Sequence, residues 1–224
     1  MVIIGILTNL IGKQICVNLM GDKPFEGILT DEGQNIIVLF NGQDYYYISL
    51  SHVHKLGIDR MSNEKIANPN VDTFMKDSED ISLRTVLSNV KRNYVEIKVK
   101  RNLTFHGYIL QVLNDYLVFY SPLFKTMYIS LAHIKWVRLY NQERNPYNLS
   151  NETFPFKPIN GSVELTLREQ LELIQGTIIV IDGGIDTLKI GLLKKVDDNM
   201  VEIVQANGEI SLIGLVHIKS VHVI

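Results

Sequence analysis

Hydrophobic and polar residues follow the same order three times along the chain, in copies that begin roughly 80 residues apart. Each copy opens with apolar residues at positions i, i+4 and i+7, the spacing of a short amphipathic helix. It continues with alternating apolar and polar residues, which is typical of strands with one buried face. In each copy a glycine within a strand-like run precedes a histidine by 25 or 26 residues. The pairs are Gly27 with His52, Gly107 with His133, and Gly191 with His217.

This pattern predicts a mostly β fold made of three tandem small barrels of the Sm-like or SH3 type, each with five strands and each preceded by a short helix. A glycine in the long second strand allows the sharp bend that closes a small sheet, and the helix covers one open end. The predicted barrels span residues 1–58, 81–140 and 165–224. Residues 59–80 and the proline-rich residues 141–164 lose the alternation, so we predict that they are linkers.

The third repeat carries two local signals. Thr166-Leu-Arg-Glu169 is a capping box that predicts the start of its helix. Its second strand is predicted at Thr187–Val196, and Asp182-Gly-Gly-Ile-Asp186 is predicted to be a turn between strands rather than a phosphate cradle, because no helix follows it.

Length and composition narrow the classes of protein. A repeat of about 60 residues buries only about 60% of the surface of its unfolded chain and is marginally stable alone, so we expect the repeats to pack on one another. The 224-residue chain has a net charge of −2, which does not favour a nucleic-acid-binding protein.

Its single cysteine, Cys16, excludes an internal disulfide framework. The sequence contains no apolar run of 18 residues, so no membrane span is predicted. The apolar N-terminus lacks a basic segment and a cleavage site, so the chain is expected to stay inside the cell that makes it.

The candidate chemistry is sparse. His52, His133 and His217 recur at one position, the break before the last strand of each repeat. A catalytic or metal site is expected once rather than three times, so we interpret these rings as structural groups that cap the turn or pack at the barrel rim. No cluster has the spacing of zinc ligands, and no nucleophile elbow or phosphate-binding loop occurs. The prediction is therefore a protein with no enzymatic activity, no cofactor and no metal.

One basic patch keeps an RNA-binding alternative open. Lys98, Lys100 and Arg101 lie close together in the second repeat, and Tyr45 and Tyr47 of the first repeat could stack on bases. These five residues form the candidate interaction surface. The first and third repeats lack an equivalent patch, and the overall charge is slightly acidic. An Sm-like RNA-binding protein is thus the alternative prediction, and nucleic acid is the less favoured partner.

Short motifs in all three repeats resemble a known family. The third repeat matches best, with Gly183-Gly184 followed by Gly191-Leu192-Leu193 and with His217-Ile-Lys-Ser-Val221. These motifs are similar to the amino-terminal domain of the Bacillus spore-coat protein B family. The arginine expected before the double glycine and the family's Ser- and Lys-rich tail are missing. The resemblance implies a structural role in the bacterial endospore coat, with the chain made in the mother-cell cytoplasm and deposited on the spore.

The predicted function follows from the strand edges and outer faces of the barrels rather than from a pocket. Strands at the edges of small barrels can pair with a neighbour's strands. Three such barrels on one chain multiply weak contacts through effective concentration. We therefore predict a non-catalytic protein–protein interaction block. Its expected partners are other spore-coat proteins, and self-association through strand edges is expected as well.

Overall fold

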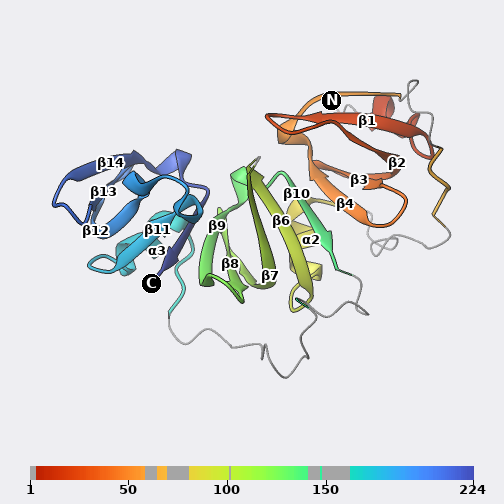
Figure 1. The fold of residues 1–224 in the computed structure, drawn as a ribbon. Helices are drawn as coiled ribbons and strands as arrows, with labels where there is room; N and C mark the ends of the chain where they lie inside the picture. Colours follow the sequence, from red (N-terminus) through yellow and green to blue (C-terminus); the bar gives the residue numbers. More distant parts are fainter. Residues whose placement is uncertain (1–3, 59–64, 70–80, 101, 141–146, 148–161) are drawn as a thin grey trace. The chain divides into compact units, whose positions relative to one another are not determined.

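The computed structural model describes residues 4–58, 65–69, 81–100, 102–140, 147 and 162–224. The chain is mostly β (Figure 1). The fifteen strands among the described residues make up an antiparallel sheet that is not closed, with β5 and β14 at its ends. The chain divides into two compact units. Unit 1 contains residues 1–90, 95–104 and 135–141, and unit 2 contains residues 91–94, 105–134 and 142–224. Residues of the predicted second repeat are thus divided between the two units.

Unit 1 contains the first repeat, together with a helix and two strands of the second. Its neighbouring strands follow the order β6-β10-β4-β3-β2-β1-β5. Its elements are α1 (Ile4–Thr8), β1 (Gln14–Leu19), β2 (Phe25–Glu32), β3 (Ile36–Phe40), β4 (Tyr45–Ser49), β5 (Val53–Ile58), α2 (Leu83–Asn89), β6 (Tyr94–Lys100) and β10 (Trp136–Leu139).

Unit 2 contains the remaining strands of the second repeat and all of the third. Its strand order is β7-β8-β9-β15-β11-β12-β13-β14. Its elements are β7 (Leu103–Val112), β8 (Tyr116–Ser121), β9 (Lys125–Ser130), α3 (Leu167–Leu173), β11 (Ile178–Ile181), β12 (Ile190–Val196), β13 (Met200–Val204), β14 (Ile210–Gly214) and β15 (Ser220–Val223).

The first and third repeats have the same strand order. The fifth strand lies beside the first, in the orders β5-β1-β2-β3-β4 and β15-β11-β12-β13-β14. The fourth strand does not pair with the fifth strand of its own repeat. Instead β4 pairs with β10, the last strand of the second repeat, and β9 pairs with β15, the last strand of the third. The prediction of a mostly β fold of short strands with few helices is confirmed, but the sheet is not closed, because β4 and β9 pair with a strand of the next repeat and β14 lies at the end of the sheet.

The hydrophobic cores follow the alternation in the sequence. In β1, Ile15, Val17 and Leu19 are buried and alternate with partly exposed residues. They pack with buried residues of β2, β3 and β4 in unit 1. A second cluster in unit 2 joins Leu167 and Leu171 of α3 to the inner faces of β11, β12, β13 and β15. Burial of these apolar side chains is the main favourable contribution to both cores.

Local signals fix the ends of the helices and the breaks before the last strands. The capping box of α3 is confirmed, because the Thr166 side chain accepts a hydrogen bond from the Glu169 amide and the Glu169 side chain accepts one from the Thr166 amide. Each predicted break is a single 3₁₀ turn that ends in a histidine. The turns are Leu50–His52, Leu131–His133 and Leu215–His217.

The third repeat departs from the predicted strand pattern between β11 and β12. The strand predicted at Thr187–Val196 begins only at Ile190, because residues Thr187–Lys189 form a 3₁₀ turn. The Asp186 side chain accepts a hydrogen bond from the Leu188 amide and so closes this turn. A second 3₁₀ turn spans Asp182–Gly184, and there Asp182 has a φ of 53°. A local hydrogen bond between a side chain and the backbone thus replaces the strand pairing that was predicted for Thr187–Lys189.

Candidate interaction surface

The three repeat-defining glycines lie where two strands come too close for a side chain. A Cβ atom on Gly107 would stand 2.0 Å from the Tyr120 carbonyl oxygen of the paired strand, and one on Gly191 would stand 2.3 Å from the Val204 carbonyl oxygen. A Cβ on Gly27 would meet the Phe40 carbonyl oxygen at 2.7 Å. The glycine in each second strand is therefore a requirement of close strand packing.

Replacing Gly107 with alanine is expected to lower the free energy of unfolding by about 1–3 kcal/mol, because the paired strand has to move away from the added methyl group. Denaturant-induced unfolding followed by circular dichroism measures this change. Gly57→Ala is the matched control, since a Cβ at Gly57 has no atom within 4 Å. Equal stabilities of the two variants would contradict the prediction.

The candidate surface of Lys98, Lys100, Arg101, Tyr45 and Tyr47 is not a shared exposed face. Tyr47 is only 2% exposed, and burial raises its pKa to about 12. Tyr45 is half-buried against Phe40, with 4.9 Å between the ring centroids. Lys98 donates a hydrogen bond to the Thr104 hydroxyl group, Lys100 is exposed, and Arg101 lies outside the described residues. Tyr47 is therefore corrected from a surface residue to a buried one.

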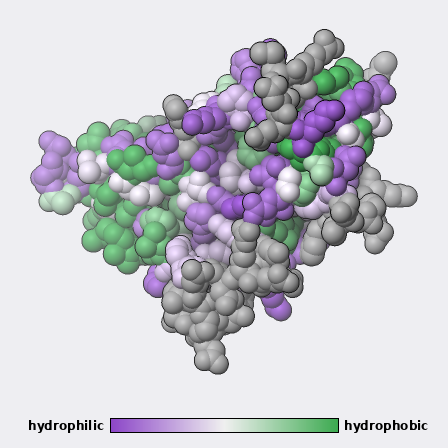
Figure 2. All heavy atoms as spheres, turned by 45° about the vertical axis from the view of Figure 1, so that its right-hand side comes forward, coloured by the Kyte–Doolittle hydropathy of each residue, from purple (hydrophilic) through white to green (hydrophobic). Residues whose placement is uncertain are grey.

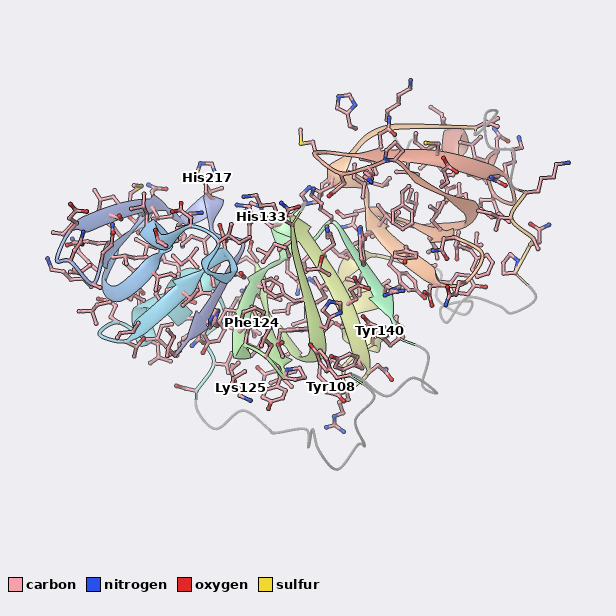
Figure 3. The ribbon with its side chains drawn as sticks, viewed as in Figure 1. Tyr108, Phe124, Lys125, His133, Tyr140 and His217 are labelled. Carbon is pink, nitrogen blue, oxygen red and sulfur yellow. The ribbon has the colours of Figure 1, made fainter. Side chains whose placement is uncertain are left out.

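The recurring histidines differ in their surroundings. The Nε2 atom of His133 lies 2.8 Å from the carbonyl oxygen of Val216, so this ring links the second repeat to the third. His52 is half-buried, whereas His217 is exposed. Figure 3 shows His133 and His217 at the ends of their strands within unit 2. The recurring position therefore marks the boundary between one repeat and the next.

Burial lowers the pKa of His133, and the nearby Lys219 lowers it further, although the bond to Val216 opposes both effects. Burial also lowers the pKa of His222. Since an unfolded histidine has a pKa near 6.5, the unfolded chain takes up protons first as the pH falls. The stability contributed by the neutral rings is therefore present above about pH 6.5 and is lost below it.

We expect the free energy of unfolding to fall as the pH is lowered from about 7.5 to 5.5. His133→Gln should reduce this slope, because an amide can still donate to the Val216 carbonyl oxygen but does not titrate. Urea titrations at a series of pH values measure the slope. An unchanged slope in the variant would show that His133 does not contribute to it.

The junction between the second and third repeats combines strand pairing with helix docking. β9 pairs with β15, so that Val221 lies opposite Tyr128. At the start of α3, the Leu167 amide donates to the Asp115 carboxylate at 2.8 Å. The backbone amide of Asn114 donates to the Leu165 carbonyl oxygen at 3.1 Å. The turn between β7 and β8 thus holds the beginning of the next repeat's helix.

A polar contact lies at the centre of this junction. The Tyr116 hydroxyl group donates to the Glu164 carbonyl oxygen at 2.7 Å and lies 3.1 Å from the side-chain oxygen of Gln170. The Gln170 amide nitrogen donates to the Tyr128 hydroxyl oxygen at 3.2 Å. Gln170 is buried, so these bonds satisfy a polar side chain on α3 that water does not reach. The polar residue on the helix meets two tyrosines on the strands below it.

The junction between the first and second repeats has the same construction in unit 1. β4 pairs with β10, so that Val137 lies opposite Tyr47. The Leu83 amide at the start of α2 donates to the Asn35 side chain at 2.8 Å. The equivalent positions are apolar here, because Val86 of α2 takes the place of Gln170 and Ile36 takes the place of Tyr116. Val86 and Ile36 are both buried.

Two cations of the second repeat add to this first junction, the buried Lys135 and the half-buried Arg138. Lys135 donates to the Asp22 carboxylate and to the Met20 carbonyl oxygen. Arg138 forms ion pairs with Asp44 and Glu96. Burial opposes the charge on Arg138, but the two carboxylates outweigh it and raise its pKa above the ordinary value. The sequence patterns did not single out Lys135 or Arg138, because the pairing across repeats is not visible in the spacing within one repeat.

The positions that are covered at both junctions are uncovered at the two ends of the sheet. On β13 and β14, Met200 and Leu212 correspond to the residues that receive a helix in the earlier repeats, and Leu212 is 64% exposed. On α1, Ile6 corresponds to the buried Val86 and Gln170 but is 69% exposed. Lys55 on β5 is exposed, whereas its equivalents Trp136 and Ser220 are buried. We name the face of Met200, Leu212 and His217 the tail face, and that of Ile6 and the outer edge of β5 the head face.

A further apolar row crosses the outer surface of the third repeat. Four residues are direct partners across β11, β12, β13 and β14. Hydrophobic side chains gather over this repeat in Figure 2, at the left of the view. The row consists of Ile178, Leu192, Val204 and Ile210, of which Ile178 is 53% and Ile210 57% exposed.

The first repeat shows how such a row can be covered. Its equivalent residues are Gln14, Ile28, Phe40 and Tyr45, which are also direct partners. The Ile66 amide of segment 65–69, which forms neither helix nor strand, donates to the Gln14 side chain at 3.1 Å. A Cβ added to Gly42, just beyond this row, would lie 3.5 Å from the side chain of Ile66. A segment with an apolar residue thus lies beside the row in the first repeat.

No group of three His, Cys, Asp or Glu side chains within the described ranges could hold a metal ion. Cys16 is a half-buried thiol on β1. No described helix has the length and apolar character needed to cross a bilayer.

The fold and these surfaces define a class of open antiparallel β protein in which tandem repeats are joined edge to edge. The family model described as the YwrJ third domain matches residues 166–221, which lie within the predicted third repeat. The uncharacterized protein YwrJ of Bacillus subtilis (strain 168) is 36% identical over 220 residues, which cover 96% of this chain and 98% of the relative. The chain belongs to the YwrJ family. No solved structure matches it.

These matches correct the predicted resemblance to the spore-coat protein B family. The family shown is YwrJ, and neither match is to a spore-coat protein B or to an Sm-like family. The short motifs around the double glycine and the last histidine were too brief to separate two families. In the structure these motifs lie at a pair of 3₁₀ turns and at the final strand, where backbone geometry limits the choice of residues.

Proposed function

We propose that this chain is a non-catalytic protein–protein interaction block whose third repeat binds an apolar segment of another protein. The exposed row of Ile178, Leu192, Val204 and Ile210 is the single observation that carries the proposal. Contiguous exposed apolar surface on a soluble domain is typical of an interaction site. The segment beside the equivalent row of the first repeat, which carries the apolar Ile66, indicates the chemistry of the partner, a segment with an apolar side chain.

The fold proposed to go with this function is three small five-stranded barrels of the Sm-like or SH3 type. The shared order of strands in the first and third repeats supports it, as does the glycine that lets the second and third strands approach closely. A barrel of this size fills its interior with side chains and leaves no ligand cavity. Binding would therefore use outer faces and edges.

A paired capture experiment tests the proposal. Immobilised chain and an Ile178→Asp/Ile210→Asp variant are exposed to the same cell extract, and the retained proteins are identified by mass spectrometry. Both substituted side chains are exposed, so the variant is expected to fold. We expect one or more proteins to be retained by the parent chain and lost with the variant. Identical sets of retained proteins would contradict the proposal.

The predicted place of action in the spore coat stays a prediction, because it came from the resemblance. Extracts from sporulating and growing cells provide its test within the same experiment. An RNA-binding protein remains the rival. Fluorescence anisotropy with single-stranded RNA at two salt concentrations separates the two, since binding that weakens steeply with salt would favour RNA. Tyr47 is buried, so it is not available to stack on an RNA base, and this supports the protein-binding proposal.

A further inference from the structure

We propose that the tail face of one copy of this chain binds the head face of a second copy, and so repeats between molecules the junction that the chain makes twice within itself. The inference rests on the proposed role as an interaction block but concerns the tail and head faces rather than the apolar row, which adjoins the tail face on β14 through Ile210. Its occupant is specified by the chain, because both halves of the contact are present and both are uncovered.

The backbone register at the two internal junctions is identical, so it predicts the register between copies. Trp136 lies opposite Ile48 and Val137 opposite Tyr47 at the first junction. The equivalent residues are paired in the same way at the second junction, where Ser220 lies opposite Ile129 and Val221 lies opposite Tyr128. Transferred to the free ends, this register pairs β5 of one copy with β14 of the other. It places Lys55 opposite Ile213 and Leu56 opposite Leu212.

The bonds that flank these strands repeat as well. The Ser49 amide donates to the Lys135 carbonyl oxygen at 2.8 Å, and the Ser130 amide donates to the Lys219 carbonyl oxygen at 3.0 Å. At the free ends, the equivalent donor is the amide of Gly214 on one copy, and the equivalent acceptor is the carbonyl oxygen of His54 on the other. The edges of β5 and β14 have no neighbouring strand among the described residues. Unpaired edges of this kind favour pairing with another chain.

The chemistry of the two free faces matches. Where the helix carries the polar Gln170, the strands beneath it carry the hydroxyl groups of Tyr116 and Tyr128. Where the helix carries the apolar Val86, its counterpart on β3 is the apolar Ile36. At the free ends, Ile6 on the head face would meet Met200 and Leu212 on the tail face, so an apolar helix residue would again meet apolar strand residues.

Two polar groups on the tail face fit the same arrangement. His133 reaches the carbonyl oxygen of Val216 in the next repeat, and the equivalent groups are the exposed His217 and the carbonyl oxygen of Ser51. Glu202 stands where Val38 and Val118 are buried in the earlier repeats, but it is paired with Lys194 at 2.8 Å. Its charge is therefore already compensated beside the apolar residues.

This contact joins two different surfaces, so it is head-to-tail rather than symmetric. That property gives a complementation test with Ile6→Asp on the head face and Leu212→Asp on the tail face. Both side chains are exposed in the single chain, so both variants are expected to fold, which circular dichroism checks. Each variant retains one intact face.

Size-exclusion chromatography with light scattering provides the readout over a concentration series. We expect the parent chain to associate, and each variant alone to dissociate at a concentration at least about tenfold higher, a change of about 1.4 kcal/mol. An equal mixture of the two variants is expected to form a one-to-one dimer, through the tail of the Ile6→Asp chain and the head of the Leu212→Asp chain. Ile178→Asp, on the apolar row, is the control and should associate as the parent chain does.

Disulfide trapping tests the register. In a Cys16→Ser background, a Leu56→Cys chain mixed with a Leu212→Cys chain should form a mixed disulfide on oxidation, since opposite residues bring the Cα atoms within range. An Ile210→Cys chain, two residues away on the same face of β14, is the matched control and should form far less. Preferential trapping of Leu212→Cys with itself would overturn the inference.

A monomeric parent chain would overturn the inference, as would undiminished self-association of the Ile6→Asp chain alone, which would indicate a tail-to-tail contact. Failure here is distinguishable from failure of the proposed function. A monomeric chain that still loses captured proteins when Ile178 and Ile210 are replaced would leave the interaction block intact and remove only the second copy as its partner.

Discussion

Replacing Trp136 with alanine is expected to lower the free energy of unfolding of unit 1 by about 3–5 kcal/mol. Trp136 belongs to the second repeat, but its side chain is buried in the core of the first. Its ring meets that of Tyr46 edge to face at a centroid distance of 5.1 Å and that of Phe25 at 6.4 Å. Removing the indole group forfeits this burial and leaves a cavity among two aromatic rings and the strands below them.

Urea-induced unfolding followed by far-ultraviolet circular dichroism measures the effect. Fluorescence does not serve here, because Trp136 is the chain's single tryptophan. Leu123→Ala is the matched control, since it also shortens a large apolar side chain but at a position that is 70% exposed. A loss of less than about 1 kcal/mol for Trp136→Ala would contradict the placement of this side chain in the first core.

The effect of Trp136 has a consequence for the independence of the first repeat. β10 supplies both a strand beside β4 and an aromatic side chain over the first core. Lys135 and Arg138 of the same segment anchor it through Asp22 and Asp44. Residues 1–58 alone lack all three contacts, so the first repeat is completed by a strand that lies 80 residues further along the chain.

Hydrophobic periodicity predicted the repeat, the strands and the turns well. The alternation of Ile15, Val17 and Leu19 identified a strand with one buried face, and the structure buries these three side chains. The break before each recurring histidine is a short turn, as at Leu131–His133. Such features depend on neighbours a few residues away, so one copy of the pattern is enough to reveal them.

The contacts between repeats were not predicted, because spacing within a repeat does not show what lies opposite an edge. Tyr47 illustrates this. Its alternating position suggested an exposed face, but α2 and the last strand of the next repeat cover β4, and the tyrosine is buried. Comparison of the aligned repeats contains the missing signal, since Gln170 and Tyr116 are both polar at one junction, whereas Val86 and Ile36 at the equivalent positions of the other junction are both apolar.

The third repeat also shows where a local bond overrides a periodic pattern. The residues from Thr187 onward alternate as a strand does, yet Asp186 closes a turn over them. Just before this turn, Asp182 is buried at the end of β11. Sequence spacing placed Asp182 in a turn between strands but did not show its burial, because its carboxylate accepts hydrogen bonds from β15, which lies 38 residues later.

Replacing Asp182 with alanine is expected to lower the free energy of unfolding of unit 2 by about 3–5 kcal/mol, because it removes a buried carboxylate and leaves its partners without acceptors. One carboxylate oxygen accepts hydrogen bonds from the Lys219 amide at 2.8 Å and the Ser220 amide at 3.3 Å, and the other accepts from the Lys189 ammonium group at 2.7 Å. Burial by itself raises the pKa of Asp182, but the bonds to Lys189 and Lys219 outweigh it and hold the pKa below the ordinary value. The stabilising charge is therefore present at neutral pH and is lost only as the pH falls below about 4.

Asp182→Asn is the matched control, since asparagine keeps an acceptor for the two amides and tolerates the positive φ. It should cost less than Asp182→Ala in urea titrations at pH 7, and equal losses would show that charge alone, rather than the anchoring of β15, accounts for the role of Asp182.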